Sequence, residues 1–240
     1  MSIATPEGHT VTDSALRELA DDPSSRKRFL KMLGGAGAAS AFGVVLAACG
    51  EEKKDASGSA AAAPSSSSDN ANDLKIVNYA LTLEYIEARF YREVGESGLI
   101  KDKAVLQIAK RFGESEQAHV DALKATARAL GGRPVSAPKT NFGPTLDKGL
   151  KHVLETAATV ENLGAAAYLG QAGKIKSKEI LASALQIHSV EARHAAALNI
   201  LVGRGFGNGK GGLEGALPDG AFGKPMSMAA VLAAVKPFLA

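Results

Sequence analysis

The residues of this chain that are best suited to chemistry form a four-residue unit that occurs twice. The first copy is Glu116-Gln-Ala-His119 and the second is Glu191-Ala-Arg-His194. Three residues along an α-helix turn the chain by about 300°, so each glutamate lies beside its histidine on one helix face. Such a pair offers one oxygen and one nitrogen ligand to a metal ion.

Both units lie on faces that a protein core would bury. Their neighbours on these faces are apolar, namely Phe112, Val120 and Leu123 in the first copy and Ile187, Ala195 and Leu198 in the second. A carboxylate in such surroundings needs a partner that balances its charge. Both copies also continue as Glu-x-x-His-x-x-Ala-Leu, which indicates an internal duplication.

Two further glutamates extend this duplication to the preceding helices. Glu84 and Glu161 each lie on an apolar stripe, and each is followed seven residues later by a tyrosine, Tyr91 or Tyr168. From this glutamate to the glutamate of the next unit is 32 residues in one half of the repeat and 30 in the other. The duplicated element is therefore predicted to be a pair of helices.

The duplication places four carboxylates and two imidazoles inside one helical bundle. We call these residues the six candidate ligands: Glu84, Glu116, His119, Glu161, Glu191 and His194. A buried unpaired charge costs several kcal/mol or is driven neutral, and Arg89 and Arg193 lie on other faces of their helices. Two divalent cations would balance the four carboxylates. Oxygen and nitrogen ligands without sulfur favour iron or manganese, with zinc as a further candidate.

The first 48 residues have the composition of an export signal. A basic segment at 25–31 precedes a run rich in Gly and Ala that extends to residue 48 and is too short and too glycine-rich for a transmembrane helix. The basic segment resembles a twin-arginine export signal, except that Lys27 stands where the second arginine belongs. Both the twin-arginine route and the general secretory route therefore stay open.

Cys49 is the only cysteine, so no disulfide can form within the chain. The segment Leu46-Ala-Ala-Cys49 resembles a bacterial lipobox, which implies cleavage before Cys49 and a lipid on its sulfur. The alternative is an incidental buried cysteine. A single lipidated residue would tether the protein to a membrane surface without spanning it. We therefore expect an exported, membrane-anchored lipoprotein that faces the periplasm or the outer side of the cell envelope.

Between the predicted anchor and the predicted fold lies a segment of low complexity. Residues 49–72 hold Ser, Ala, Asp, Lys and Glu without any large apolar side chain, which predicts a flexible linker. The remaining 168 residues are enough for one domain with a hydrophobic core. The formal net charge of +3, without a basic stripe that interleaves aromatic residues, argues against a nucleic-acid partner.

The hydrophobic periodicity predicts an all-α fold. Four helical stretches at about 73–95, 103–130, 146–171 and 177–202 are separated by Gly-rich or Pro-rich breaks. The break at 133–144 contains three prolines and is long enough to cross the length of a bundle. We therefore expect a four-helix bundle over 73–203, built from two antiparallel hairpins joined by a long crossover.

Residues 204–240 are predicted to form a glycine-rich loop and a C-terminal helix. Ser227 would be its N-cap, with Val231, Leu232, Val235 and Leu239 on its apolar side. This helix either packs against its own bundle or binds a partner, which includes a second copy in a homodimer.

The six candidate ligands resemble those of the ferritin-like superfamily of dinuclear carboxylate proteins. In that superfamily, two helices each give one glutamate and two others each give a Glu-x-x-His unit. The segments 83–91, 190–198 and 223–228 resemble a branch of exported bacterial members also called desiccation-related. The resemblance covers residues 73–240. It implies that Glu116 and Glu191 bridge two metal ions, while the other four candidate ligands each bind one.

Other polar residues near this site have alternative interpretations. Tyr91 and Tyr168 either hydrogen-bond to ligands across the site, as the resemblance implies, or pack as ordinary bundle residues. Glu87 lies beside Glu84 on its helix, but its counterpart in the repeat is Gly164, so we expect Glu87 at the rim. His188 is expected to be a core or rim histidine rather than a ligand.

The sequence thus favours an exported di-metal oxidoreductase of the ferroxidase or peroxidase/catalase type. It would oxidise ferrous iron, or consume dioxygen or peroxide, at a buried dinuclear centre. The alternative is a non-catalytic envelope stress or interaction protein whose metals are structural. With one cysteine there is no Cys-x-x-Cys pair for an iron–thiolate centre, so any reductant must come from another molecule.

Overall fold

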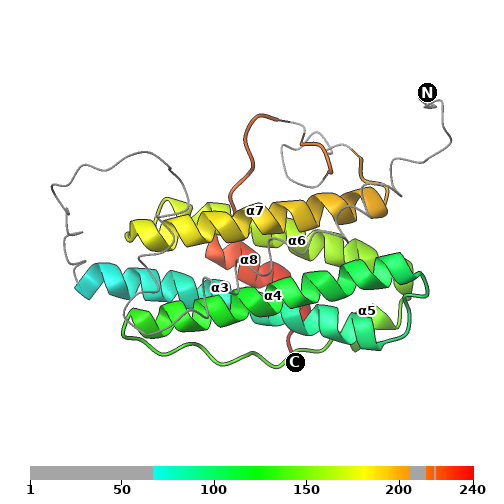
Figure 1. The fold of residues 1–240 in the computed structure, drawn as a ribbon, viewed down its shortest axis with the longest axis horizontal. Coiled ribbons are helices and arrows are strands. Elements are labelled where there is room, and N and C mark those ends of the chain that lie inside the picture. The colour runs from blue at the N-terminus through cyan, green and yellow to red at the C-terminus, as the bar shows by residue number, and fades with distance from the viewer. Residues whose placement is uncertain (1–66, 206–214, 219) are drawn as a thin grey trace, which may run out of the picture.

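The computed structural model describes residues 67–205, 215–218 and 220–240, and this part of the chain is all-helical. Four long helices form a bundle (Figure 1). They are α3 (Ser67–Glu96), α4 (Lys103–Ala129), α6 (Leu150–Ala172) and α7 (Lys178–Leu201). The predicted fold class is confirmed. The predicted export signal, Cys49, the linker up to residue 66 and the loop residues 206–214 and 219 lie outside the described residues.

The four helices pair as two antiparallel hairpins, α3 with α4 and α6 with α7. A short turn joins the helices of each pair. In the first turn Gly98 has a φ of +69°, a backbone conformation that glycine adopts without steric cost. Asp102 then caps α4, since its Oδ1 accepts hydrogen bonds from the backbone N–H groups of Ala104 and Val105 at 2.8 and 2.9 Å.

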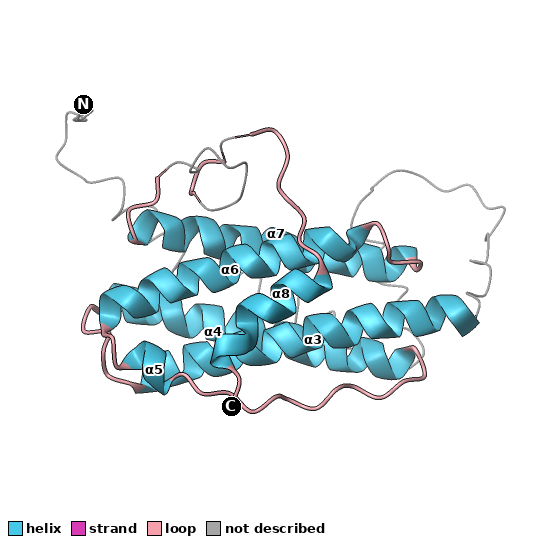
Figure 2. Cartoon of the chain, turned by 180° about the vertical axis from the view of Figure 1, so that it is seen from behind, coloured by secondary structure: helices cyan, strands magenta, loops and turns pink. Residues whose placement is uncertain are grey.

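The connection between the hairpins runs along the bundle to the one-turn helix α5 (Gly143–Leu146) (Figure 2). Asn78 of α3 holds this connection, because its side chain donates to Arg133 O and accepts from the Val135 N–H group. The helix predicted from residue 146 begins at Leu150 instead. Gly149 has a φ of +83°, which separates α5 from α6.

The first helix begins six residues earlier than predicted, so the predicted linker 49–72 overlaps α3 over residues 67–72. Asp73 is buried, and its carboxylate accepts hydrogen bonds from the N–H groups of Lys176 and Ser177 at 2.9 and 2.7 Å. Asn72 donates to Lys174 O at 2.8 Å. Polar contacts to the turn between α6 and α7 therefore order a segment that has no apolar face to predict it.

The C-terminal helix α8 (Met228–Val235) packs on its own bundle, against α6, and a 3-10 turn η2 (Lys236–Phe238) follows it. Ser227 caps α8 as predicted, because its Oγ accepts from the Ala230 N–H group. Val231 and Val235 are buried, whereas Leu232 and Leu239 are 43% and 39% exposed. The predicted apolar side is thus wrong at two positions. Leu232 is turned about 100° from Val231, and η2 takes Leu239 off the helix.

The hydrophobic core has a different character on the two sides of the bundle's middle. One cluster contains Phe90, Phe112 and Phe142, while the other contains Val77 and Ile180 among mainly aliphatic side chains. Within the described ranges, no helix is long and apolar enough to cross a membrane.

Candidate metal centre

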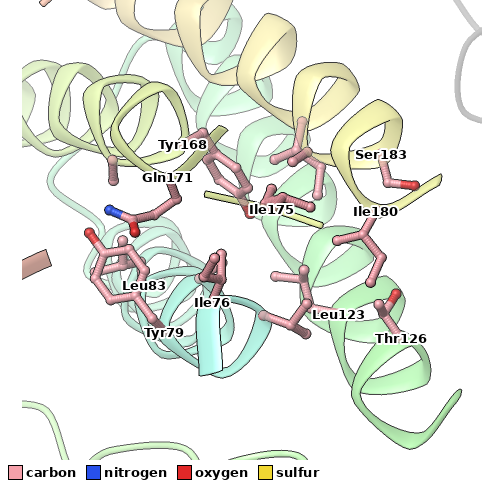
Figure 3. Close-up of a pocket in the computed structure, with 15 residues that line it drawn as sticks. Ile76, Tyr79, Leu83, Leu123, Thr126, Tyr168, Gln171, Ile175, Ile180 and Ser183 are labelled. Atoms are coloured by element: carbon pink, nitrogen blue, oxygen red, sulfur yellow. The ribbon is translucent and has the colours of Figure 1, made fainter. Parts of the chain in front are cut away.

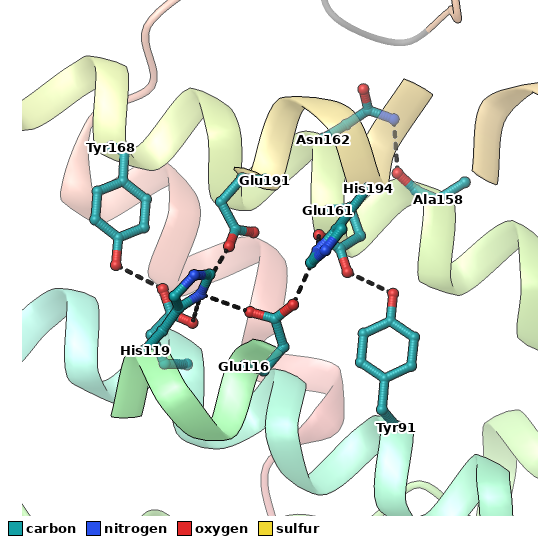
Figure 4. Close-up of polar contacts among 10 residues, drawn as sticks. Tyr91, Glu116, His119, Ala158, Glu161, Asn162, Tyr168, Glu191 and His194 are labelled. Carbon is teal, nitrogen blue, oxygen red and sulfur yellow. Dashed lines mark hydrogen bonds and ion pairs between the residues drawn. The ribbon is translucent and has the colours of Figure 1, made fainter. Parts of the chain in front are cut away.

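The bundle brings all six candidate ligands together in its middle (Figure 4). Glu84 comes from α3, Glu116 and His119 from α4, Glu161 from α6, and Glu191 and His194 from α7. The four glutamates are 0% exposed, and the two histidines are 4% and 7% exposed. Each side chain lies on the face that the helical periodicity turns inward, so the register of the duplicated hairpins positions the cluster.

The six residues form two overlapping groups, each able to place four ligand atoms within 4.8 Å of one another. One group contains Glu84 and His119, and the other contains Glu161 and His194. Glu116 and Glu191 belong to both groups. This is the arrangement that two neighbouring cations would need if two carboxylates were shared between them.

Single nitrogen atoms lie among several carboxylates in both groups. His119 Nδ1 is 2.9 Å from Glu116 Oε2, and 3.2 Å from both Glu84 Oε2 and Glu191 Oε1. A ring nitrogen carries at most one hydrogen, so it cannot donate to all three oxygens. Adjacent ligand atoms about 2.1 Å from one ion would lie about 3 Å apart. The spacing therefore suits ligands grouped around a cation.

The second group is less satisfied by hydrogen bonds alone. His194 Nδ1 lies 2.9 Å from Glu116 Oε1 and 3.3 Å from Glu161 Oε2, which are ion-pair distances. Yet these three atoms and both oxygens of Glu191 have no partner with hydrogen-bond geometry among the described residues. A buried polar atom without a partner costs about 1–3 kcal/mol. The residues present thus fit a pair of metal ions, which would bind these atoms.

Burial and mutual repulsion keep some of the carboxyl groups protonated when no metal is bound. Burial raises the pKa of Glu84 to about 7, against the lowering effect of His119. Burial, followed by the charge of Glu116, raises the pKa of Glu191 well above its usual range. Glu116 is the exception. Burial opposes its ionisation, but His119 and His194 lower its pKa below the usual range.

The two imidazoles are protonated in the same state. Burial alone would lower the pKa of His119, but the charges of Glu84 and Glu116 raise it well above its usual range. The pKa of His194 is raised in the same way, against burial, by Glu161 and Glu116. Binding of metal ions by these side chains must therefore displace protons.

Tyr91 and Tyr168 hydrogen-bond across the site, which decides between the two interpretations of these residues. The Tyr91 hydroxyl of α3 donates to Glu161 Oε1 of α6 at 2.5 Å, and the Tyr168 hydroxyl of α6 donates to Glu84 Oε1 of α3 at 2.5 Å. Burial and the charge of the bonded glutamate raise the pKa of each tyrosine well above its usual range, so both remain proton donors. Each hairpin thus orients a carboxylate of the other.

The rim position predicted for Glu87 is wrong, because this residue is only 3% exposed. Gly164 of α6 makes the space for it. A Cβ atom at Gly164 would lie 3.0 Å from Glu87 Oε1 and 2.7 Å from Glu191 Oε2. Burial, then the charges of Glu191 and Glu84, raise the pKa of Glu87 well above its usual range. The glycine opposite Glu87 was itself the sequence signal that this carboxyl points inward.

Two other expectations near the site are confirmed. His188 is half-buried and its Nδ1 donates to Ala165 O at 3.0 Å, so it is a satisfied histidine outside the cluster. Gly113 allows close helix packing, since a Cβ atom there would lie 3.0 Å from the Cβ of Tyr91.

We expect the metal-free protein to lose stability as the pH rises from about 5 to 7. Glu84 ionises near pH 4.5 in the unfolded chain but near pH 7 in the fold. A raised carboxyl pKa means that stability present below pH 4.5 is lost above it, by about 1.4 kcal/mol per pH unit. Glu191, His119 and His194 act in the same direction, and the opposite contribution of Glu116 is complete below this window.

The measurement is the melting temperature at pH 5, 6 and 7, in chelator and in excess Mn²⁺. The melting temperature in chelator should fall across this range, and the stabilisation by Mn²⁺ should increase. Parallel curves in the two conditions would contradict proton release by the candidate ligands.

Replacing Glu87 by Gln should stabilise the metal-free protein at pH 8 but not at pH 4. Glutamine imitates the protonated carboxyl, so Glu87→Gln removes the loss of stability that the raised pKa of Glu87 causes as the pH rises. Urea unfolding in chelator at both pH values measures this difference. Glu96→Gln, on the exposed end of the same helix, is the matched control. An equal effect of Glu87→Gln at both pH values would show that Glu87 is independent of the cluster.

Comparison with known proteins agrees with this geometry. A family model described as a ferritin-like domain matches residues 72–204, which is more than half of the chain. No curated protein is significantly similar to the sequence. The matched range contains the four long helices almost completely, and with them all six candidate ligands. The chain therefore belongs to the family of ferritin-like domain proteins.

Proposed function

We propose that this ferritin-like bundle binds two divalent metal ions, iron or manganese, and uses them to oxidise ferrous iron or to consume dioxygen or peroxide. The observation that carries the proposal is the pair of overlapping ligand groups, each with one histidine of its own and two carboxylates in common. Four buried carboxylates and two imidazoles without sulfur suit these metals.

The residues of the chain would have distinct roles. Glu116 and Glu191 would bridge the ions, Glu84 with His119 would complete one site, and the two remaining candidate ligands would complete the other. Bound iron or manganese would supply the electron transfer to dioxygen or peroxide. The protein would hold the ligands in place through the two tyrosine hydroxyls, and the complete burial of the glutamates would exclude bulk water.

Replacing Glu116 by Gln tests the proposal, because it removes one shared ligand charge and keeps the size of the side chain. We expect the bound metal to fall from two ions to one or fewer per chain, and oxidation of ferrous iron by dioxygen or peroxide to slow by more than about 100-fold. Elemental analysis and stopped-flow absorbance measure the two effects. Glu114→Gln, two residues earlier on the exposed side of α4, should change neither.

A second candidate function is a non-catalytic bundle whose metals are structural. The observation that favours it is that the candidate ligands come from all four long helices, so bound ions would hold both hairpins together. Chelation that lowers the melting temperature of a wild-type protein with no reaction toward ferrous iron, dioxygen or peroxide would support this function. It would also overturn the oxidoreductase.

We also propose that the protein is exported and anchored by a lipid on Cys49, as in the desiccation-related branch that its sequence resembles. Support comes from the basic and apolar segments before Cys49 and from the lipobox-like sequence. The reductant would then come from the cell envelope, because the chain has no second cysteine.

Mass spectrometry of the protein from bacterial membranes tests this proposal. The mature chain should begin at Cys49 and carry the mass of a diacylglyceryl group. Cys49→Ser should release the protein into the soluble fraction, whereas Ser57→Ala, in the same segment, should leave it in the membrane fraction. A membrane-bound chain with an uncleaved N-terminus would contradict lipidation.

A further inference from the structure

A cavity of about 30 Å³ lies between the four long helices, at the end of the bundle where α3 and α7 begin (Figure 3). Most of its wall is aliphatic, and the side chains used below are Ala80, Leu123, Ile180, Ala184 and Ile187. Thr126 and Ser183, which also line it, are half-buried, so the cavity extends toward the surface between α4 and α7.

The cavity lies one helical turn from the metal centre on three helices. Three wall residues are four positions from a candidate ligand: Ala80 from Glu84, Leu123 from His119, and Ile187 from Glu191. Four residues of α-helix rise about 6 Å. Tyr168 belongs to both places, since it lines the cavity and its hydroxyl donates to Glu84. A small molecule in the cavity would therefore be separated from the ligands mainly by the Tyr168 side chain.

Two polar side chains of this wall have no hydrogen-bond partner within the part of the chain that the structure describes. They are Gln171, with both amide atoms unpaired, and Tyr79, with its hydroxyl unpaired. Gln171 is 3% exposed and Tyr79 is 8% exposed. Burial, then the charge of Glu87, raises the pKa of Tyr79, so its hydroxyl stays a donor. Buried groups of this kind need a hydrogen-bonding occupant.

The equivalent space at the other end of the duplication is filled. Phe112 is the counterpart of Ile187 in the repeat, four residues before the glutamate of its unit. Its ring stacks on the His194 imidazole with ring centres 3.9 Å apart, and it packs with Phe90 and Phe142 in the aromatic cluster. The two halves therefore share their ligands but not their packing, and only the half with Ile187 keeps a cavity beside the ligands among the described residues.

We propose that this cavity is the site at which hydrogen peroxide binds before it reaches the metal centre, held by Gln171 and Tyr79. The proposal rests on the proposed function and adds the oxidant and its route. A volume of about 30 Å³ holds two water-sized atoms, which is the size of a two-oxygen molecule. Peroxide both donates and accepts, so it satisfies the amide and the hydroxyl, whereas dioxygen donates nothing and leaves the Gln171 carbonyl unpaired.

The reaction that would follow is balanced by the proposed centre. Reduction of one hydrogen peroxide breaks its O–O bond and gives two waters. The two electrons come from the two ferrous ions, which become ferric, and the two protons come from solvent.

Gln171→Leu is the first test, since it removes the hydrogen bonds and keeps an apolar wall. In the iron-loaded protein, the second-order rate with hydrogen peroxide should fall about tenfold. The rate with dioxygen and the bound iron should be unchanged. Gln117→Leu, the same change on the exposed face of α4, should alter neither rate. Unchanged peroxide kinetics in Gln171→Leu would mean that the cavity holds water only and would overturn the proposal, as would a slowing of the dioxygen reaction alone.

Filling the cavity is the second test, and it has a readout without metal. Xenon added to the metal-free wild-type protein should shift the methyl NMR signals of Ile180 and Ile187, and Ala184→Leu should abolish these shifts and slow the peroxide reaction about tenfold. Ala129→Leu, at the exposed end of α4, is the control. The absence of xenon shifts in the wild-type protein would overturn the proposal.

The two proposals fail in different ways. Wild-type protein that binds two metal ions but reacts with neither oxidant would contradict the proposed function and the entry role together, even where xenon binds. Normal peroxide kinetics in both Gln171→Leu and Ala184→Leu would contradict the cavity site alone and leave the oxidoreductase standing.

Discussion

The structure depends on the repulsion between four fully buried carboxyl groups that face one another. Without cations, this repulsion is relieved by protons and by two charged imidazoles, and it raises the pKa of Glu191 while His119 and His194 lower that of Glu116. Such an arrangement is costly for a fold that has no other use for it. Its presence at the meeting point of all four helices explains why the bundle needs tyrosine donors, apolar cover and a precise helix register at the same place.

The two hairpins solve this problem with the same ligands but with different surroundings. Around the half with Phe112, aromatic rings pack against one histidine, and the core is closed. Around the half with Ile187, aliphatic side chains leave space beside the ligands, with Gln171 and Tyr79 on its wall. Duplication thus supplied symmetric metal ligation, and later divergence of the packing residues distinguished one approach to the centre from the other.

The sequence predicted the helices and the cluster well because both follow from the 3.6-residue period. Acids on apolar stripes, repeated at matched distances, identify inward positions without knowledge of the packing. The misses are tertiary effects. Glu87 points inward because Gly164, on another helix, leaves room for it, and the start of α3 is fixed by contacts of Asp73 with a distant turn. Leu232 is exposed because α8 is short and ends in a 3-10 turn.

The reciprocal hydrogen bonds of the two tyrosines carry a consequence for the history of the fold. Tyr91 orients a glutamate of the second hairpin, and Tyr168 orients the matching glutamate of the first. An exchange in which each partner completes the other is the contact that two identical chains make across a twofold axis. A single ancestral hairpin that associated in pairs would already have possessed the whole centre. Fusion of two such genes would have freed each copy to change on its own.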